Sequence, residues 1–139
     1  MQRVVLDTNV LVSSLIQRSH PYRIVNDFLL EQKIELCVSD EVLAEYYEVL
    51  NRKKFAQYAD FLKNAETLLA DIELNANKFR PKRKLRIISD HSDNKFLELA
   101  EICKAHFLIT GNTNDFTMQV YKRTKIVTPK IYLEKYCPE

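Results

Sequence analysis

Four acidic residues stand where predicted strands end or where the next helices begin. Asp7 directly follows a short apolar run, and Asp115 lies in a polar turn after another such run. Glu45 and Asp93 fall in the first or second turn of predicted helices that follow strands. In a parallel α/β sheet these positions share one edge, where side chains from several strands converge. We therefore expect the four carboxylates to meet in one cleft and to be catalytic.

Converging carboxylates repel one another and raise one another's pKa values unless a divalent cation neutralises them. A set of oxygen ligands without histidine or thiolate suits Mg²⁺ or Mn²⁺ and argues against zinc. Such cations bind phosphate oxygens, lower the pKa of a water molecule and stabilise the leaving oxygen of a displacement. The acids therefore predict metal-dependent hydrolysis of phosphodiester bonds.

Each acid also has a purely structural explanation. Asp7, together with the two polar residues after it, is a typical cap for the next helix. Glu45 at the edge of a helix is able to reach water. The dipole of a helix favours an acid such as Asp93 in the first turn, and Asp115 is an ordinary turn residue. The case for chemistry depends on the four acids occurring together.

The position of Glu45 on its helix separates it from its acidic neighbours. At about 100° per residue, Glu45 lies nearer to the centre of the apolar face than Glu41 or Glu48 does. It therefore falls at the border of the buried stripe. A carboxylate there must be paired, hydrogen-bonded or bound to metal, whereas the other two are free to be solvated.

Hydrophobic periodicity predicts one α/β domain over residues 1–139. Apolar runs predict strands, and apolar residues at helical spacing predict helices, with Ser39 and Ser92 as helix caps. The expected strands are 3–7, 34–38, 107–110 and 125–128. The expected helices are 10–20, ended by Pro21, then 22–32, 40–50, 55–74, 93–103 and 131–136.

Composition narrows the class of protein. The chain has 139 residues, of which 46% are hydrophobic and 29% charged, which is ordinary for a globular domain. It contains no apolar run of transmembrane length and no secretion signal, so we expect a cytoplasmic protein without a membrane partner. Its three cysteines show no metal-binding spacing. The single glycine, Gly111, excludes glycine-rich phosphate and dinucleotide loops.

A basic stretch surrounds Pro81. A solvated loop that keeps the protein soluble is one explanation of this charge, and a contact with the phosphates of RNA is the other. Contact with RNA is favoured if the acids form a nuclease site, because the loop would then hold a polynucleotide across the cleft. The predicted RNA-binding residues are Lys78, Arg80, Lys82, Arg83, Lys84 and Arg86.

The ordered motifs of this chain resemble those of PIN domains. They comprise residues 5–11, Glu45 in its helix, residues 90–100, residues 108–112, and the closing 126–129 with Leu133. The resemblance covers nearly the whole chain. It implies a three-layer α/β/α fold with a roughly five-stranded parallel sheet, a Mg²⁺ or Mn²⁺ site and endoribonuclease activity. Small single-domain members resemble the toxins of toxin–antitoxin pairs, which implies a homodimer and a small antitoxin partner.

The resemblance also assigns residues by position. Asp7, Glu45 and Asp93 match the three acids of the family. Where many members have a further acid, this chain has Asn112, whose amide oxygen is able to ligate a hard cation but carries no charge. The loss of that charge leaves open whether the site holds one metal ion or two. The residues expected to support the site are Thr8, Asn9, Asp90 and Thr110.

Two other functions compete with this one. A phosphatase with an aspartyl nucleophile would need a second acid two residues after Asp7, but Asn9 occupies that place. A PIN fold without activity, which binds RNA or a protein partner, is supported by Asn112 and opposed by the three intact acids. The identity of the RNA target depends on loop shape, which the residues do not specify.

Overall fold

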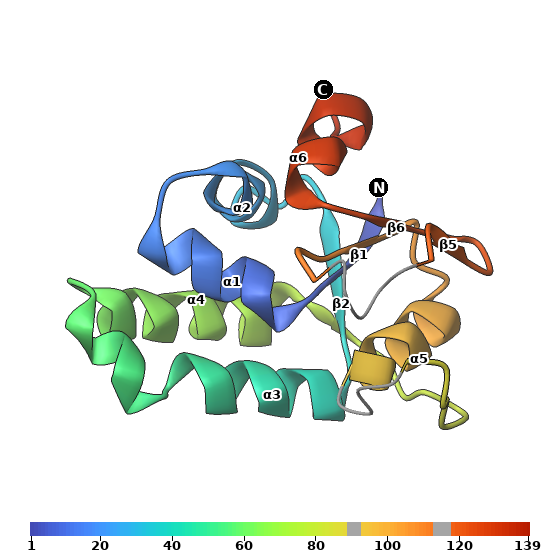
Figure 1. Ribbon diagram of the computed structural model, residues 1–139, viewed down its shortest axis with the longest axis horizontal. Helices are drawn as coiled ribbons and strands as arrows, with labels where there is room; N and C mark the ends of the chain where they lie inside the picture. The colour runs from blue at the N-terminus through green and yellow to red at the C-terminus, as the bar shows by residue number, and fades with distance from the viewer. Residues whose placement is uncertain (89–92, 113–117) are drawn as a thin grey trace.

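The computed structural model describes residues 1–88, 93–112 and 118–139, which form a mostly parallel six-stranded sheet flanked by helices (Figure 1). The strands are β1 (Arg3–Leu6), β2 (Glu35–Val38), β3 (Asn77–Lys78), β4 (Phe107–Ile109), β5 (Val120–Tyr121) and β6 (Thr124–Val127). Their order is β3-β2-β1-β4-β6-β5. Every neighbouring pair is parallel except β5 with β6. The predicted parallel sheet is thus confirmed, with β5 as an antiparallel addition.

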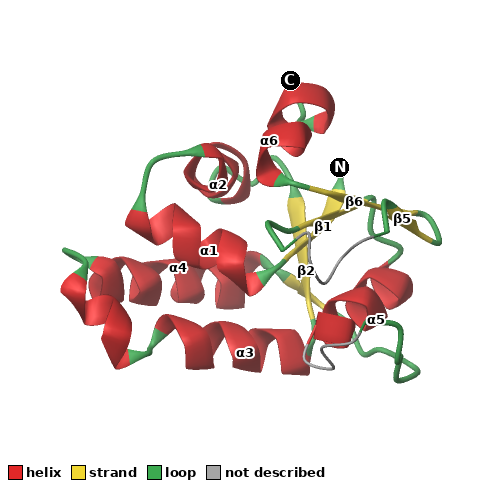
Figure 2. Ribbon diagram, in the orientation of Figure 1, coloured by secondary structure: helices red, strands yellow, loops and turns green. Residues whose placement is uncertain are grey.

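The helices cover both sides of this sheet, as Figure 2 shows in red. Helices α1, α3 and α4 lie on one side of the strands, and α5 lies on the other (Figure 1). The described helical segments are α1 (Thr8–Ile16), α2 (His20–Arg23), the π-helix η1 (Ile24–Leu29), α3 (Asp40–Leu50), the 3₁₀ helix η2 (Lys53–Gln57), α4 (Phe61–Asn75), α5 (Asn94–Cys103), α6 (Pro129–Ile131) and the π-helix η4 (Tyr132–Tyr136).

Strand β1 lies in the middle of the sheet and is covered on both faces. Val4, Val5 and Leu6 are each fully buried. A continuous apolar run is what a parallel strand between two helical layers requires, because neither face meets water. Asp7 follows directly and is thereby carried to the carboxyl edge of the sheet.

Helix α3 begins where its sequence predicts. The backbone N–H of Val42 donates to Oγ of Ser39 over 3.2 Å, which satisfies one of the free amides of the first turn. Tyr46 on the same helix is fully buried, and its hydroxyl donates to the carbonyl of Leu6 over 2.6 Å. Burial raises the pKa of Tyr46, so this phenol stays protonated and fixes α3 to the end of β1.

Two helix predictions were wrong in their bounds. The predicted helix over 55–74 is split into η2 and α4, because Asp60 adopts a left-handed backbone with φ 59°. Asp tolerates this conformation better than most residues. Pro21 does not end α1, because α1 already ends at Ile16. Pro21 lies in the first turn of α2, where the backbone N–H has no partner within the helix, so its absence in proline costs nothing.

Strands β3 and β5 were not predicted, since two residues are too few for a periodic signal. Within the described parts of the chain, all three cysteines are free, with Cys37 and Cys103 buried. No described helix has both the length and the apolar character that crossing a membrane requires. The predicted cap Ser92 lies outside the described residues.

Candidate active site

Asp7 is a buried carboxylate at the carboxyl end of β1, with only 3% of its surface exposed. Its backbone N–H continues the sheet by donating to the carbonyl of Ile109 over 3.0 Å. Asp7 occupies the cap position of α1, but its side chain makes no capping hydrogen bond. Oδ2 instead accepts from the hydroxyl of Thr110 over 2.6 Å. The Asp7 side chain is therefore tied to the end of β4 as well as lying at the start of α1.

The surroundings of Asp7 disfavour its negative charge. Burial raises the pKa of the Asp7 carboxyl, hydrogen bonds from Thr110 and from the backbone of Asn9 lower it, and the charge of Glu45 adds a smaller increase. The raising influences prevail. A buried carboxylate with a raised pKa next to a second acid is typical of sites that bind a cation or transfer a proton.

Glu45 lies at the border of the buried face of α3, as its helical position predicts, whereas Glu41 and Glu48 are exposed. Oε2 of Glu45 accepts a hydrogen bond from the hydroxyl of Thr8. Oε1 accepts from Nζ of Lys95 over 2.9 Å. Both carboxylate oxygens are thus held by residues from the first turns of α1 and α5.

Asp93 lies at the N-terminus of α5 and is 9% exposed. Its Oδ2 accepts from Nδ2 of Asn112 over 3.4 Å. The backbone N–H of Asn112 in turn donates to the hydroxyl of Thr110 over 3.0 Å. Because that same hydroxyl donates to Asp7, a chain of hydrogen bonds links Asp7 to Asp93 through the polar end of β4.

These side chains match a hard cation in the type of atom they offer. Asp7, Glu45, Asp93 and Asn112 provide oxygen ligands, which suit Mg²⁺ or Mn²⁺. A cation between Asp7 and Glu45 would relieve the repulsion that raises the pKa of Asp7. Within residues 1–88, 93–112 and 118–139, no three His, Cys, Asp or Glu side chains are grouped closely enough to hold a metal ion. The positive partner of Glu45 is Lys95.

The remaining predicted residues are only partly brought together. Thr8 and Thr110 contact the acids, whereas Asn9 is exposed. Asp90 and Asp115 lie outside the described residues. Sequence reasoning missed Lys95, although a signal for it exists: it follows Asp93 by two residues in the first turn of the same helix.

Half of the six predicted RNA-binding residues are paired with acids. Arg80, Lys82 and Arg86 are exposed and form no ion pair with the part of the chain that the structure describes. The paired residues support a structural role for the basic stretch, and the unpaired residues are available to contact RNA phosphates. The pairs are Lys78 with Asp40 at 3.3 Å, Arg83 with Glu101 at 2.6 Å, and Lys84 with Glu41.

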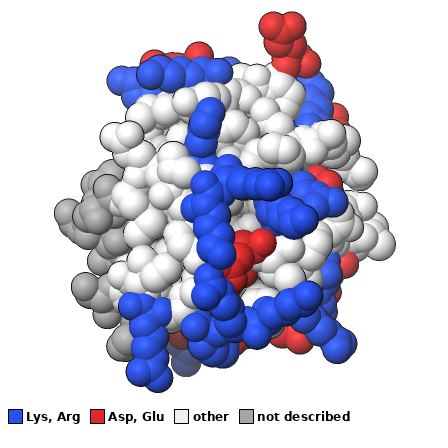
Figure 3. Space-filling view, turned by 90° about the vertical axis from the view of Figure 1, so that its right-hand side faces the viewer, with Lys and Arg blue, Asp and Glu red and all other residues white. Residues whose placement is uncertain are grey.

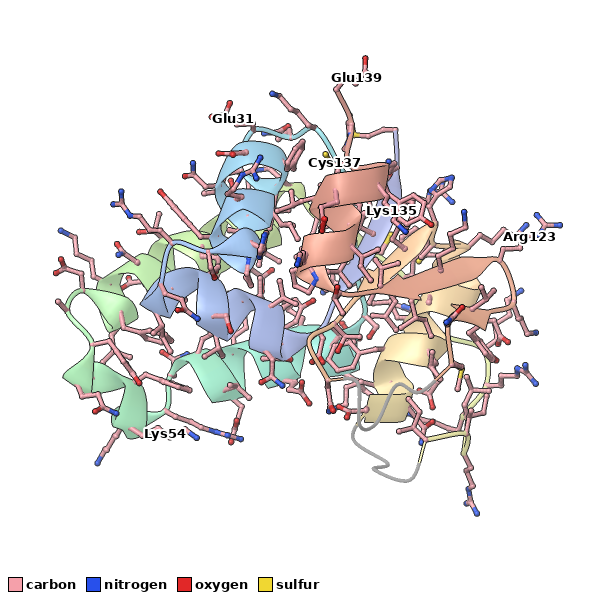
Figure 4. All side chains as sticks on the ribbon, turned by 45° about the horizontal axis from the view of Figure 1, so that its top comes forward. Glu31, Lys54, Arg123, Lys135, Cys137 and Glu139 are labelled. Carbon is pink, nitrogen blue, oxygen red and sulfur yellow. The ribbon has the colours of Figure 1, made fainter. Side chains whose placement is uncertain are left out.

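Positive charge extends beyond this stretch. Glu101 accepts from both Arg83 and Lys122, which joins the basic stretch to the β5–β6 hairpin. Arg123 of the hairpin points outward from the molecule (Figure 4). Lys and Arg side chains run in a nearly continuous column down this face, with few acids between them (Figure 3). A polyanion would find a long cationic surface here.

The family model for the PIN domain matches residues 3–114. The chain therefore belongs to the PIN domain family, a family of nucleases, which agrees with the hydrolytic chemistry predicted from its acids. An uncharacterised protein of Methanocaldococcus jannaschii is 26% identical over 145 residues, an alignment that covers 96% of this chain and 91% of that protein.

Two solved structures share the fold. One is VapBC2 from Rickettsia felis bound to a DNA fragment from its promoter, with a TM-score of 0.56 and 18% identity over 91% of this chain and 98% of the other. The second is FitAB bound to a DNA fragment, with a TM-score of 0.53 and 15% identity over 91% and 94% of the two chains. At these identities the likeness establishes the PIN fold.

Proposed function

We propose that this chain is a Mg²⁺- or Mn²⁺-dependent endoribonuclease, in which Asp7, Glu45, Asp93 and Asn112 hold the metal. The observation that carries the proposal is the buried Asp7 carboxylate, whose raised pKa reflects burial and the nearby charge of Glu45. The chemistry that the cation supplies when bound is neutralisation of phosphate charge and activation of water for in-line attack.

The residues of the chain orient the acids for this chemistry. Thr110 directs Oδ2 of Asp7, and Thr8 directs Oε2 of Glu45. Burial lowers the local dielectric around Asp7, which strengthens its interaction with a cation. Asp115 is proposed as a further catalytic acid because it lies in the polar turn after β4, and Asp90 is proposed as a supporting residue from the family motifs.

RNA is the proposed substrate, and the basic residues are proposed to bind its phosphates. Arg80, Lys82 and Arg86 contribute most, because they do not have to break an internal ion pair. The column of Lys and Arg in Figure 3 then offers further positive charge to the phosphates of the same RNA strand.

The resemblance to small PIN toxins supports a role in a toxin–antitoxin pair, as a homodimer inhibited by a small antitoxin in the cytoplasm. A pocket of about 380 Å³ lies between α1, η1 and α4, lined in part by Leu15, Val25 and Leu68. The exposed side chains of Ile16 and Leu30 also line it. We propose that an apolar segment of the antitoxin lies here.

A binding module without activity is the second candidate. Two observations favour it: Asn112 replaces an acid of the family pattern, and Lys95 already neutralises Glu45. Such a protein would hold RNA on its basic face without cutting it.

A metal titration separates the two candidates. Purified protein is incubated with a mixed RNA pool, or with single-stranded DNA, at increasing Mg²⁺ or Mn²⁺. The variants are Asp93→Asn and Glu45→Gln, with Glu66→Gln on the exposed face of α4 as the matched control. RNA cleavage that needs metal, and that only the first two variants abolish, supports the nuclease. RNA binding without cleavage at any metal concentration supports the binding module.

A further inference from the structure

We infer that a cavity next to Glu45 accepts one base of the RNA strand, and that the carboxylate of Glu98 selects guanine there. The inference rests on the proposed function, because it takes RNA as the substrate and Glu45 as part of the site that cuts it. It assigns the base specificity of that site to one side chain.

The cavity lies at the carboxyl edge of the sheet and has a volume of about 340 Å³. Ser39, which follows β2, and Phe79, which follows β3, lie in its wall. Glu41 of α3 and Glu98 of α5 also line it. A cavity of this size falls in the range that binds small organic groups.

Two helices connect this cavity to Glu45. Glu41 precedes Glu45 by four residues on α3, so the two side chains lie about one helical turn apart. On α5, Lys95 precedes Glu98 by three residues, and Nζ of Lys95 lies 2.9 Å from Oε1 of Glu45. An RNA strand cut at Glu45 would therefore place a neighbouring base at the cavity.

Glu98 presents a buried carboxylate to this cavity. The residue is 5% exposed, and its Oε2 accepts from the backbone N–H of Leu85 over 2.8 Å. Within the described residues Oε1 accepts no hydrogen bond, and Nζ of Lys84 lies 3.8 Å from it. Among the described side chains, no oxygen that lacks a hydrogen bond is sealed from solvent. Oε1 of Glu98 is therefore within reach of a ligand in the cavity.

Lys84 does not neutralise this carboxylate fully. Its ammonium group contacts Glu41 more closely than Glu98, and its side chain is 71% exposed. Water screens the charge of such an exposed lysine. Glu98 thus keeps its capacity to accept hydrogen bonds from a bound base.

An ionised carboxylate only accepts hydrogen bonds, and this decides which base it selects. The Watson–Crick edge of guanine presents two adjacent donors, N1–H and the N2 amino group, which match the two carboxylate oxygens. Adenine and cytosine place an acceptor beside their amino group, and uracil flanks its single N–H with two carbonyl oxygens. Each of these three bases would set a lone pair against Glu98, so guanine binds best.

The other groups of the cavity suit a nucleotide better than a cationic protein segment. Phe79 offers an aromatic ring for stacking, and Cζ of Arg3 lies 5.9 Å from the centre of this ring, which holds it in place. Arg80 and Lys82 line the cavity, are exposed, and form no ion pair with the described parts of the chain. Their charges attract phosphate and repel the Arg or Lys of a protein that would otherwise pair with Glu98.

The test is fluorescence anisotropy in EDTA, which measures RNA binding without metal and without cleavage. The probes are short single-stranded oligouridines that contain one central guanosine, inosine, adenosine or cytidine. Inosine differs from guanosine only in the missing N2 amino group. We expect the guanosine probe to bind at least about tenfold more tightly than the adenosine probe and about fivefold more tightly than the inosine probe.

Three variants assign the preference to the cavity, with circular dichroism as the check on folding. Glu98→Gln keeps an acceptor for the N–H of Leu85 but removes the pair of acceptors, and it should reduce the preference for guanosine over adenosine at least about fivefold. Phe79→Leu should weaken binding of the guanosine probe about fivefold and keep the preference. Glu66→Gln on the exposed face of α4 is the matched control and should resemble wild type.

Equal binding of the guanosine and inosine probes by wild type would overturn the inference, and this comparison does not depend on any variant. An unchanged preference in folded Glu98→Gln would overturn it as well, and so would displacement of RNA-independent binding in favour of an arginine-rich peptide. Metal-dependent cleavage of RNA without a base preference would refute the inference and leave the nuclease standing. A guanosine preference in a protein that cleaves no RNA would refute the nuclease and leave the guanine cavity standing.

Discussion

The hydroxyl of Thr110 lies 2.6 Å from Oδ2 of Asp7, although the two residues are 103 positions apart. The parallel pairing of β1 with β4 places them side by side, because Leu6 is in register with Ile109. The same hydroxyl accepts the backbone N–H of Asn112. Thr110 thus connects Asp7 to Asn112, which is one of the predicted metal ligands.

Replacing Thr110 tests this connection. We expect Thr110→Val to reduce RNA cleavage by about 10- to 100-fold, as the loss of an orienting hydrogen bond around metal ligands typically does. Thr110→Ser keeps the hydroxyl and should retain most of the activity. The measurement is the initial cleavage rate at saturating Mn²⁺, with the free energy of unfolding recorded for each protein. Equal rates for the Val and Ser variants would contradict the orienting role.

Ionised Asp7 is expected to cost stability in metal-free protein. Its pKa is raised by burial above the ordinary value of 3.8, so folding favours the protonated carboxyl. The stability it contributes is present at low pH and is lost as the pH rises through the raised pKa. Asp7→Asn should therefore be more stable than wild type at neutral pH. Urea unfolding in EDTA from acid to neutral pH measures this, and a difference that does not grow with pH would refute it.

Asn94 holds the segment before α5 in place. This side chain is 2% exposed; its Oδ1 accepts from the backbone N–H groups of Ile87 and Ile88, and its Nδ2 donates to the carbonyl of Ile88. Asn94→Ala leaves these backbone groups unpaired, and we expect a loss of about 2–3 kcal/mol in the free energy of unfolding. Asn75→Ala on α4 is the matched control, because that asparagine is exposed. Equal free energies of unfolding for the two variants would contradict the stabilising role of the Asn94 hydrogen bonds.

The two halves of the basic stretch should differ in RNA binding. Neutralising Arg80, Lys82 and Arg86 together by Gln should reduce the slope of log affinity against log salt concentration by roughly 0.7 per residue. Replacing Lys78, Arg83 and Lys84 together by Gln should reduce this slope less, because these three side chains already pair with acids. Filter binding in an Asp7→Asn background isolates binding from cleavage. The reverse ranking would show that the internal pairs open for RNA.

The sequence alone determined the local features of this protein. The apolar run before Asp7, the cap at Ser39 and the border position of Glu45 all depend on neighbours within a few residues, so periodicity and residue type predict them. Because parallel strands end at one edge, the position of Asp7 at that edge was also predictable in outline. The family motifs added the PIN fold, which the comparisons confirm.

Only the tertiary structure decided which side chains touch. The bond between Thr110 and Asp7 depends on strand register, and the ion pair of Lys95 with Glu45 depends on how α5 packs beside α3. The break at Asp60 and the two-residue strands likewise carry no periodic signal. Contacts of this kind join residues far apart in the chain, and their distances are set by packing between elements, which the pattern within each element does not encode.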